Sequence, residues 1–172
     1  MGYTENLIDF IGKSTDCYHA VKTAKDRLDE NGFTELFEGD KWDVQNDGKY
    51  YVIRNSSSII AFEMPKKDFG AFMICASHTD SPSFKLKPDF EINADGCIKL
   101  SVEGYGGMIM SSWLDRPLSI SGRIVTAKDG KVETKLVNID RDLLVIPSLA
   151  IHMSRDINKL SLIHISEPTR RS

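Results

Sequence analysis

The feature that most constrains the fold is an uninterrupted apolar run at residues 70–76, with the sequence GAFMICA. It contains no charged side chain and no alternation of apolar and polar positions. Such a run is typical of a strand that is buried on both faces of an α/β sheet. It ends abruptly in the polar stretch SHTDSP at residues 77–82. Because open α/β sheets form their sites just beyond the carboxyl ends of strands, the sequence predicts a functional site there.

Two helices are expected before this strand. Thr4 is a candidate N-cap for a short helix that ends near Ile11. Ser14 or Thr15 is the expected N-cap of a longer helix, whose apolar positions recur at helical spacing as far as Leu28.

Short β-strands are expected on both sides of the apolar run. Residues 50–53 and 59–64 are apolar and are separated by a polar turn, which predicts a hairpin. After Pro88, alternating segments are separated by turn dipeptides such as Asp129-Gly130. The sequence therefore predicts an α/β part up to residue 88, followed by an antiparallel β part.

Charge and cysteine usage exclude several classes of partner. The net charge is −3, and no run of five like charges marks a nucleic-acid tail or a polybasic membrane patch. No stretch of eighteen apolar residues could span a bilayer, and the N-terminus lacks a basic region and a cleavage site. The three cysteines have no C-x-x-C spacing, which favours a reducing compartment. We expect a cytoplasmic protein with no nucleic-acid or membrane partner.

His78 and Asp80 are the candidate site residues in the polar stretch. A neutral imidazole is a good zinc ligand, and a nearby carboxylate can accept its other N–H, which fixes the tautomer. On spacing alone, the favoured interpretation is a locally hydrogen-bonded histidine and an Asp that caps the turn before Pro82.

A longer string around these residues changes that interpretation. Residues 76–88, ASHTDSPSFKLKP, closely resemble the first metal-binding motif of aspartyl aminopeptidases, a family of di-zinc exopeptidases. Further blocks resemble family segments in the same order, at residues 14–21, 101–107, 113–123 and 146–155. In the first of them, the proline usual before the aromatic–His pair is missing. The resemblance covers residues 7–158.

This resemblance implies roles for individual residues. His78 would be a ligand of one of two zinc ions, and Asp80 a catalytic carboxylate at or near the metal. His152 lies in a block that, in the family, brings a histidine to an active site. We favour a substrate contact over a zinc ligand for His152, because a ligand from a swapped domain would make zinc binding depend on assembly. Without the family, His152 would be interpreted as a buried histidine, and His19 as a packing or surface residue.

Most of the implied site is absent from this sequence. The resemblance implies a bridging carboxylate, further ligands and an adjacent Glu-Glu pair after an inserted domain, and this sequence contains no Glu-Glu. A catalytic zinc generally takes three ligands from the protein. Residues 160–170 match what a sequencing adapter encodes in one reading frame, so we expect residues 160–172 to be a non-native tail. A natural short tail is the alternative.

The predicted organisation is an incomplete α/β zinc-exopeptidase catalytic domain at residues 1–88, then the start of an inserted antiparallel β dimerisation domain at residues 89–159. The implied function is that of a homo-oligomeric metalloaminopeptidase that removes an N-terminal acidic residue from peptides. This chain would be an inactive fragment of that enzyme. The alternatives are a non-catalytic β-rich interaction module and a related di-zinc aminopeptidase of other specificity.

Overall fold

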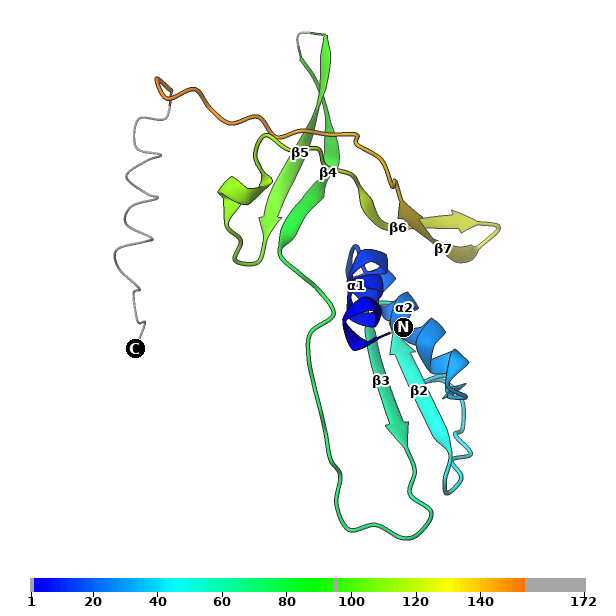
Figure 1. Ribbon diagram of the computed structural model, residues 1–172. Coiled ribbons are helices and arrows are strands. Elements are labelled where there is room, and N and C mark those ends of the chain that lie inside the picture. Colours follow the sequence, from blue (N-terminus) through cyan, green and yellow to red (C-terminus); the bar gives the residue numbers. More distant parts are fainter. Residues whose placement is uncertain (1, 95, 154–172) are drawn as a thin grey trace, which may run out of the picture. The chain divides into compact units, whose positions relative to one another are not determined.

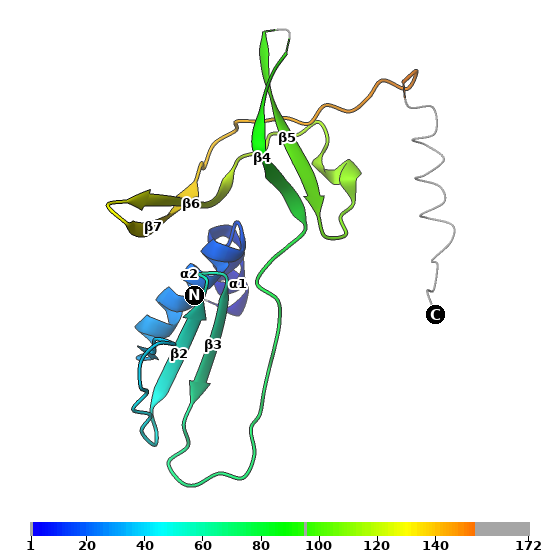
Figure 2. The same cartoon turned by 180° about the vertical axis from the view of Figure 1, so that it is seen from behind.

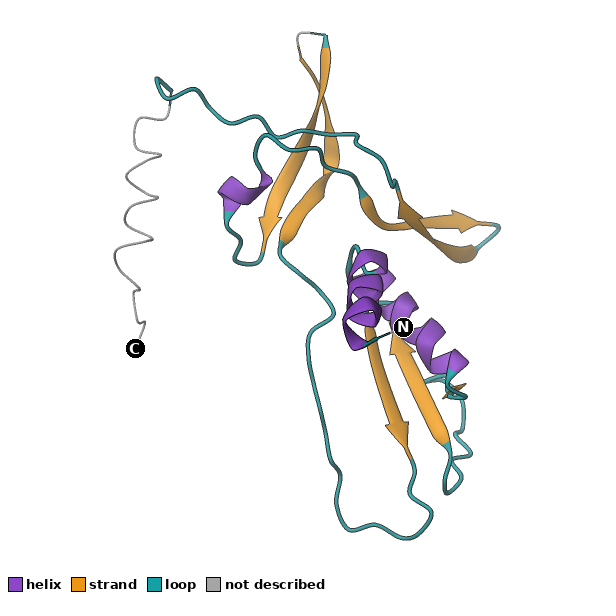
Figure 3. Cartoon of the chain, viewed as in Figure 1, coloured by secondary structure: helices purple, strands orange, loops and turns teal. Residues whose placement is uncertain are grey.

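The computed structural model describes residues 2–94 and 96–153. Its described residues form two compact units: residues 2–108 with Ser119–Asp140 make up the first, and Ile109–Leu118 with residues 141–153 make up the second. The described α-helices and paired strands belong to the first unit (Figure 1). Helices and strands together confirm the predicted mixed α/β character of the chain (Figure 3).

The two predicted helices are present at the start of the first unit. Helix α1 spans Tyr3–Lys13 and helix α2 spans Cys17–Glu30. Thr4 lies inside the first turn of α1 and Gly2 occupies the cap position, so the predicted Thr4 cap is wrong. Val21 of α2 is only 2% exposed, as the helical spacing of apolar residues predicts.

Asp16 is the N-cap of α2. Its Oδ1 atom accepts the backbone N–H groups of Tyr18 at 2.8 Å and His19 at 3.0 Å, two donors that a helix start leaves unpaired. Its Oδ2 atom lies 2.6 Å from His19 Nδ1. The predicted cap at Ser14 or Thr15 is therefore wrong. A carboxylate is favoured there because it also interacts with the positive end of the helix dipole.

A small sheet packs with these helices. Strand β1 spans Thr34–Glu35, β2 spans Lys49–Arg54 and β3 spans Ser58–Glu63. β1 runs parallel to β2. β2 and β3 form an antiparallel hairpin (Figure 2). The hairpin turn places Asn55 and Ser56 at φ values of 52° and 56°, a left-handed conformation that Asn tolerates better than most residues. The predicted hairpin is confirmed.

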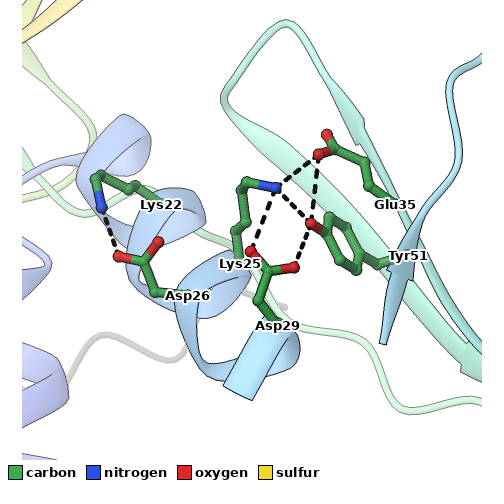
Figure 4. A network of polar contacts seen from close by, with 6 residues as sticks. All are labelled: Lys22, Lys25, Asp26, Asp29, Glu35 and Tyr51. Atoms are coloured by element: carbon green, nitrogen blue, oxygen red, sulfur yellow. Dashed lines mark hydrogen bonds and ion pairs between the residues drawn. The ribbon is translucent and has the colours of Figure 1, made fainter. Parts of the chain in front are cut away.

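A polar network around Tyr51 joins the sheet to α2. The Tyr51 side chain is 0% exposed, and its hydroxyl donates to Asp29 Oδ1 at 2.7 Å and accepts a hydrogen bond from Lys25 (Figure 4). Lys25 also donates to Glu35 of β1 at 2.6 Å. The Glu35 carboxylate and the Tyr51 hydroxyl hold the pKa of Lys25 above its usual range. The Tyr51 hydroxyl also lies 3.3 Å from Glu35 Oε2, so the network gives the buried hydroxyl charged partners on both α2 and β1.

A long hairpin follows the small sheet in the sequence. Strand β4 spans Ser83–Ala94 and pairs antiparallel with β5, Cys97–Tyr105. The register shifts between Leu86 and Glu91. Pro88 lies in this irregular stretch, where its missing N–H removes a donor from the ladder.

A second hairpin completes the first unit. Strand β6 spans Ser121–Lys128 and pairs antiparallel with β7, Lys131–Asn138. Asp129 and Gly130 connect them at φ values of 52° and 74°, as the Asp-Gly dipeptide predicts for a two-residue turn. The two hairpins confirm the antiparallel strand pairs that the sequence predicts after residue 88.

The second unit contains the short 3-10 helix η1, Met110–Trp113. Single β-bridges connect the two segments of this unit, one of them between Leu114 and Ile146. Asp115 reinforces the connection, because its Oδ1 atom accepts the backbone N–H of Ser148 at 2.9 Å.

The apolar run at residues 70–76 does not form the predicted strand. It lies in the loop between β3 and β4, and Phe72, Met73 and Ile74 are 79%, 101% and 83% exposed. A β-strand needs a neighbour that accepts and donates its backbone hydrogen bonds, and no strand in the described part of the chain pairs with this run. The expectation of a strand interior to a sheet is therefore wrong for this structure.

The predicted division of the chain at residue 88 falls inside strand β4. The assignment of residues 1–88 and 89–159 to a catalytic and a dimerisation domain stays a prediction. The predicted non-native tail, residues 160–172, lies outside the described residues.

Candidate functional site

The candidate site lies in the loop that leads into β4. Thr79 ties this loop to the β2–β3 turn, because its hydroxyl donates to the carbonyl oxygen of Ser57 at 2.7 Å. His78 and Asp80 flank Thr79 in the sequence, and the His78 ring contacts Asp80. The position of the site thus depends on a local anchor and not on the strand that the sequence predicted.

His78 is oriented by Asp80. Its Nδ1 atom lies 2.7 Å from the backbone carbonyl oxygen of Asp80 and 3.2 Å from the Asp80 Oδ1 atom. A carbonyl and a carboxylate can only accept hydrogen bonds, so Nδ1 must carry the proton. In the neutral imidazole, the lone pair is then on Nε2, and the side chain is 79% exposed. His78 therefore presents Nε2 as an available ligand atom.

Tyr105 holds the other oxygen of the Asp80 carboxylate. The Tyr105 hydroxyl donates to Asp80 Oδ2 at 2.5 Å. This hydrogen bond keeps the pKa of Asp80 below its usual range and raises the pKa of Tyr105. Asp80 is therefore a carboxylate at neutral pH, which is the form that can accept the imidazole N–H.

The β4–β5 hairpin brings Asp80 and Tyr105 together although they are 25 positions apart in the sequence. In the β4–β5 ladder, Ser83 is paired with Tyr105, so the end of β5 lies beside the segment that follows Asp80. Sequence reasoning treated the stretch around Tyr105 only as part of a family block and assigned it no role. The alternation of apolar and polar residues indicated the strands themselves. The register in which β4 and β5 pair, which brings Tyr105 to Asp80, could not be obtained from that alternation.

The site lies in an open depression of about 400 Å³. Its lining consists of His78, Asp80, Ser81, Pro82, Tyr105 and Gly106. Gly106 has a φ of 74°, and a Cβ atom there would lie 3.5 Å from Pro82 Cγ. The positive φ is the reason why glycine suits this position.

The donor chemistry of His78 fits one ligand of a zinc ion. Zinc binds neutral imidazole nitrogen, and the second ring nitrogen of such ligands usually donates to a carbonyl or carboxylate, as Nδ1 does here. A catalytic zinc takes three protein ligands. Over residues 2–94 and 96–153, no group of three or more His, Cys, Asp and Glu side chains is placed to hold a metal. The described residues thus offer His78 as a ligand without completing a site.

The other histidines considered from the sequence lie elsewhere. His152 belongs to the second unit, where it is exposed in a turn, and its participation in the site of His78 stays a prediction. The His19 side chain is 13% exposed and is paired with Asp16, which agrees with the first of the two roles expected for it, packing or surface. Cys17, Cys75 and Cys97 are all free thiols.

A comparison with known families decides the membership of the chain. The sequence model of the family described as Aminopeptidase I zinc metalloprotease (M18) matches residues 10–166. The chain belongs to the M18 family. The resemblance to aspartyl aminopeptidases, which the motif around His78 predicts, is thereby confirmed.

Individual M18 proteins agree with this membership. The protein named "Probable M18 family aminopeptidase 2" of Clostridium acetobutylicum is 48% identical over 164 residues, which cover 91% of this chain and 37% of that protein. A chain in the cryo-EM structure of the Ape4 and Nbr1 complex has a TM-score of 0.83 and 42% identity, and the match covers 90% of this chain and 30% of that one. The S. cerevisiae mApe1 dodecamer structure matches with a TM-score of 0.72 and 33% identity, over 86% of this chain and 36% of that chain.

The fold of the chain is therefore that of part of an M18 aminopeptidase. The chain spans 37% of the length of its Clostridium relative. Of the helices that the structure describes, none has the length and apolar character needed to cross a bilayer.

Proposed function

We propose that this chain is the N-terminal part of a metalloaminopeptidase that removes an N-terminal acidic residue from peptides with two zinc ions per subunit. The observation that carries the proposal is the arrangement of His78 and Asp80. An exposed imidazole whose Nδ1 atom lies 2.7 Å from a carbonyl oxygen, and so keeps its proton, presents Nε2 in the form that zinc requires. Membership of a zinc metalloprotease family supports the interpretation of His78 as a zinc ligand.

Each residue of this chain would have a limited task. His78 would hold one zinc ion through Nε2, and Asp80 would keep the proton on Nδ1 and so keep the ring in the correct tautomer. Bound zinc supplies a more acidic water molecule and polarises a carbonyl group. His152 would contact the substrate. The bridging carboxylate, the remaining ligands and the general base would come from sequence that follows the β-rich part.

The 172-residue chain would have no peptidase activity by itself. It spans 37% of a full-length relative, and its described residues provide no complete metal site. Without a metal, a water molecule keeps a pKa far above 7 and provides no nucleophile at neutral pH.

The β-rich part would assemble the complete enzyme into a homo-oligomer in the cytoplasm. Exposed apolar side chains lie along the β4–β5 and β6–β7 hairpins, including Ile98, Val125 and Val132, which are 67%, 53% and 73% exposed. Two-stranded hairpins are marginally stable without a packing partner. A solved relative forms a dodecamer, which supports assembly through such surfaces.

The test begins with the gene. In the genome, the DNA that follows codon 159 should encode a Glu-Glu pair and further Asp and His residues in place of the tail at residues 160–172. A natural stop codon after this tail would favour a non-catalytic β-rich interaction module. The complete polypeptide and the 172-residue chain should then be assayed with aspartyl, glutamyl and leucyl anilides. We expect the complete polypeptide to hydrolyse the acidic anilides and the short chain to hydrolyse none. Preferential hydrolysis of the leucyl anilide would favour a related aminopeptidase of other specificity.

A further inference from the structure

We propose that Tyr105 is a positioning residue for the zinc ligand His78, and that it acts through the carboxylate of Asp80. The inference rests on the proposed function, because it concerns the ligand role of His78. It adds a residue from β5 to a site that the sequence motif places entirely in the loop before β4.

The Asp80 carboxylate bridges two partners. Its Oδ2 atom accepts the Tyr105 hydroxyl at 2.5 Å, and its Oδ1 atom lies 3.2 Å from His78 Nδ1. The Asp80 side chain is 40% exposed and the His78 side chain 79% exposed, so surrounding atoms alone do not fix either group. A hydrogen bond to one carboxylate oxygen restricts rotation of the whole group. Tyr105 therefore keeps Oδ1 directed at the imidazole.

Tyr105 is itself held in place from two directions. The β4–β5 ladder pairs its backbone with Ser83, and the Lys85 Nζ atom lies 3.6 Å from the centre of its ring. A cation over an aromatic face is attracted to it, which restricts the ring. The next residue, Gly106, packs beside Pro82. The backbone pairing at the end of β5 and the contact with Lys85 therefore restrict where the Tyr105 hydroxyl can lie, and they keep it beside Asp80.

This arrangement predicts a measurable effect on metal binding. Removal of a partner of a ligating histidine typically lowers metal affinity or activity about 10–100-fold. Tyr105 acts one step further from the metal, so Tyr105→Phe should lower zinc affinity about tenfold, the lower end of that range. Phe keeps the ring that Lys85 contacts, so the fold of the hairpin should be retained.

The experiment measures zinc affinity of the complete polypeptide by competition with a chelator, together with kcat and KM. The variants are Tyr105→Phe, Asp80→Asn and the double variant, with Tyr3→Phe as the matched control because Tyr3 is 98% exposed on α1. If Tyr105 acts through Asp80, adding Tyr105→Phe to Asp80→Asn should weaken zinc binding little further, because coupled residues are not additive. At saturating zinc, KM should stay unchanged.

Two results would overturn the inference while leaving the proposed function intact. One is a zinc affinity of Tyr105→Phe equal to that of Tyr3→Phe. The other is a double variant in which the two single losses multiply, which would mean that Tyr105 acts independently of Asp80. If Tyr105→Phe lowers the melting midpoint, the double variant still decides, because a purely structural loss of zinc affinity would multiply with that of Asp80→Asn and a loss that passes through Asp80 would not. Full zinc affinity in His78→Ala would instead contradict the proposed function itself, which rests on His78 as a zinc ligand.

Discussion

His78 Nδ1 and the backbone carbonyl oxygen of Asp80 lie 2.7 Å apart, in a loop without regular secondary structure. The contact joins a ring nitrogen to a group of the main chain, so it does not depend on the Asp80 rotamer. The loop thus carries its own means of fixing the histidine tautomer. The Asp80 carboxylate and Tyr105 add a second means, which depends on a side chain and on a distant strand.

The first prediction concerns this tautomer. Nitrogen-15 NMR at a pH of about 8, where an imidazole is neutral, should show the proton of zinc-free His78 on Nδ1. The physical reason is that both neighbours of Nδ1 are acceptors. His152, which lies exposed in a turn, serves as the comparison within the same spectrum. A His78 ring protonated on Nε2 would contradict the described geometry.

The second prediction concerns the buried hydroxyl of Tyr51. Tyr51→Phe removes the partner shared by Lys25 and Asp29, which are hydrogen-bonded to it. Hydrogen bonds to charged groups contribute about 1.5–3 kcal/mol. Because Lys25 and Asp29 are 32% and 46% exposed and water can replace part of the interaction, we expect a loss of about 1–2 kcal/mol.

Hydrogen exchange of the α2 and β2 amides in the complete polypeptide measures this loss of stability locally. A loss of this size should speed their exchange about 5–30-fold. Tyr3→Phe, a change at a 98% exposed tyrosine, should leave these rates unchanged. Equal rates in Tyr51→Phe and the original protein would show that the network adds no stability.

The third prediction concerns acid and the cap of α2. Burial opposes ionisation of Asp16, but hydrogen bonds from the His19 backbone, Ser121 and the His19 ring outweigh it and keep the pKa of Asp16 below its usual range. A carboxyl group with a lowered pKa stabilises the folded state fully above its unfolded pKa of about 3.9. That contribution is lost as the pH falls below this value through the lowered pKa.

Amide exchange in the first turn of α2 should therefore accelerate as the pH falls below about 4, after correction for the intrinsic exchange rate. Asp16→Ala should remove about 1 kcal/mol of cap stability at neutral pH. Asp16→Asn keeps a good cap without a titrating group, so its exchange should not depend on pH in this range. Acid dependence that persists in Asp16→Asn would assign the effect to another group.

The fourth prediction concerns the chain expressed alone. Exposed apolar side chains lie on α1, at Leu7, Ile8 and Ile11, and in the loop at Phe72 and Met73. Contiguous exposed apolar surface and unpaired strand edges favour aggregation. The 172-residue chain should elute as aggregates and bind a hydrophobic dye. A monomeric product that melts cooperatively would show that these surfaces need no further partner.

Local patterns in the sequence were sufficient to predict the elements that neighbouring residues determine. The β2–β3 hairpin and the Asp129-Gly130 turn depend on neighbouring residues, and both were predicted. The helical face of α2 that contains Val21 was predicted for the same reason. The cap of α2 was misplaced, because Ser14 and Thr15 are good cap residues too and the choice of Asp16 depends on where the helix begins.

Features that depend on distant segments were not predictable in the same way. The run at residues 70–76 has the composition of a buried strand, but its pairing depends on strands that the described residues do not supply. The contact between Asp80 and Tyr105 depends on the register of β4 and β5. His78 and Asp80 were found from a motif, and their mutual contact follows from their spacing of two residues.

The most direct test of the central claim is the zinc content of the complete polypeptide and of its His78→Ala variant. The measurement is atomic emission of protein that has been dialysed against metal-free buffer, with Tyr3→Phe as a control for handling. The account predicts two zinc ions per subunit in the original protein and in Tyr3→Phe, and the loss of at least one of them, together with hydrolysis of aspartyl anilide, in His78→Ala. Full zinc content and normal turnover in His78→Ala would contradict the claim that this histidine is a metal ligand.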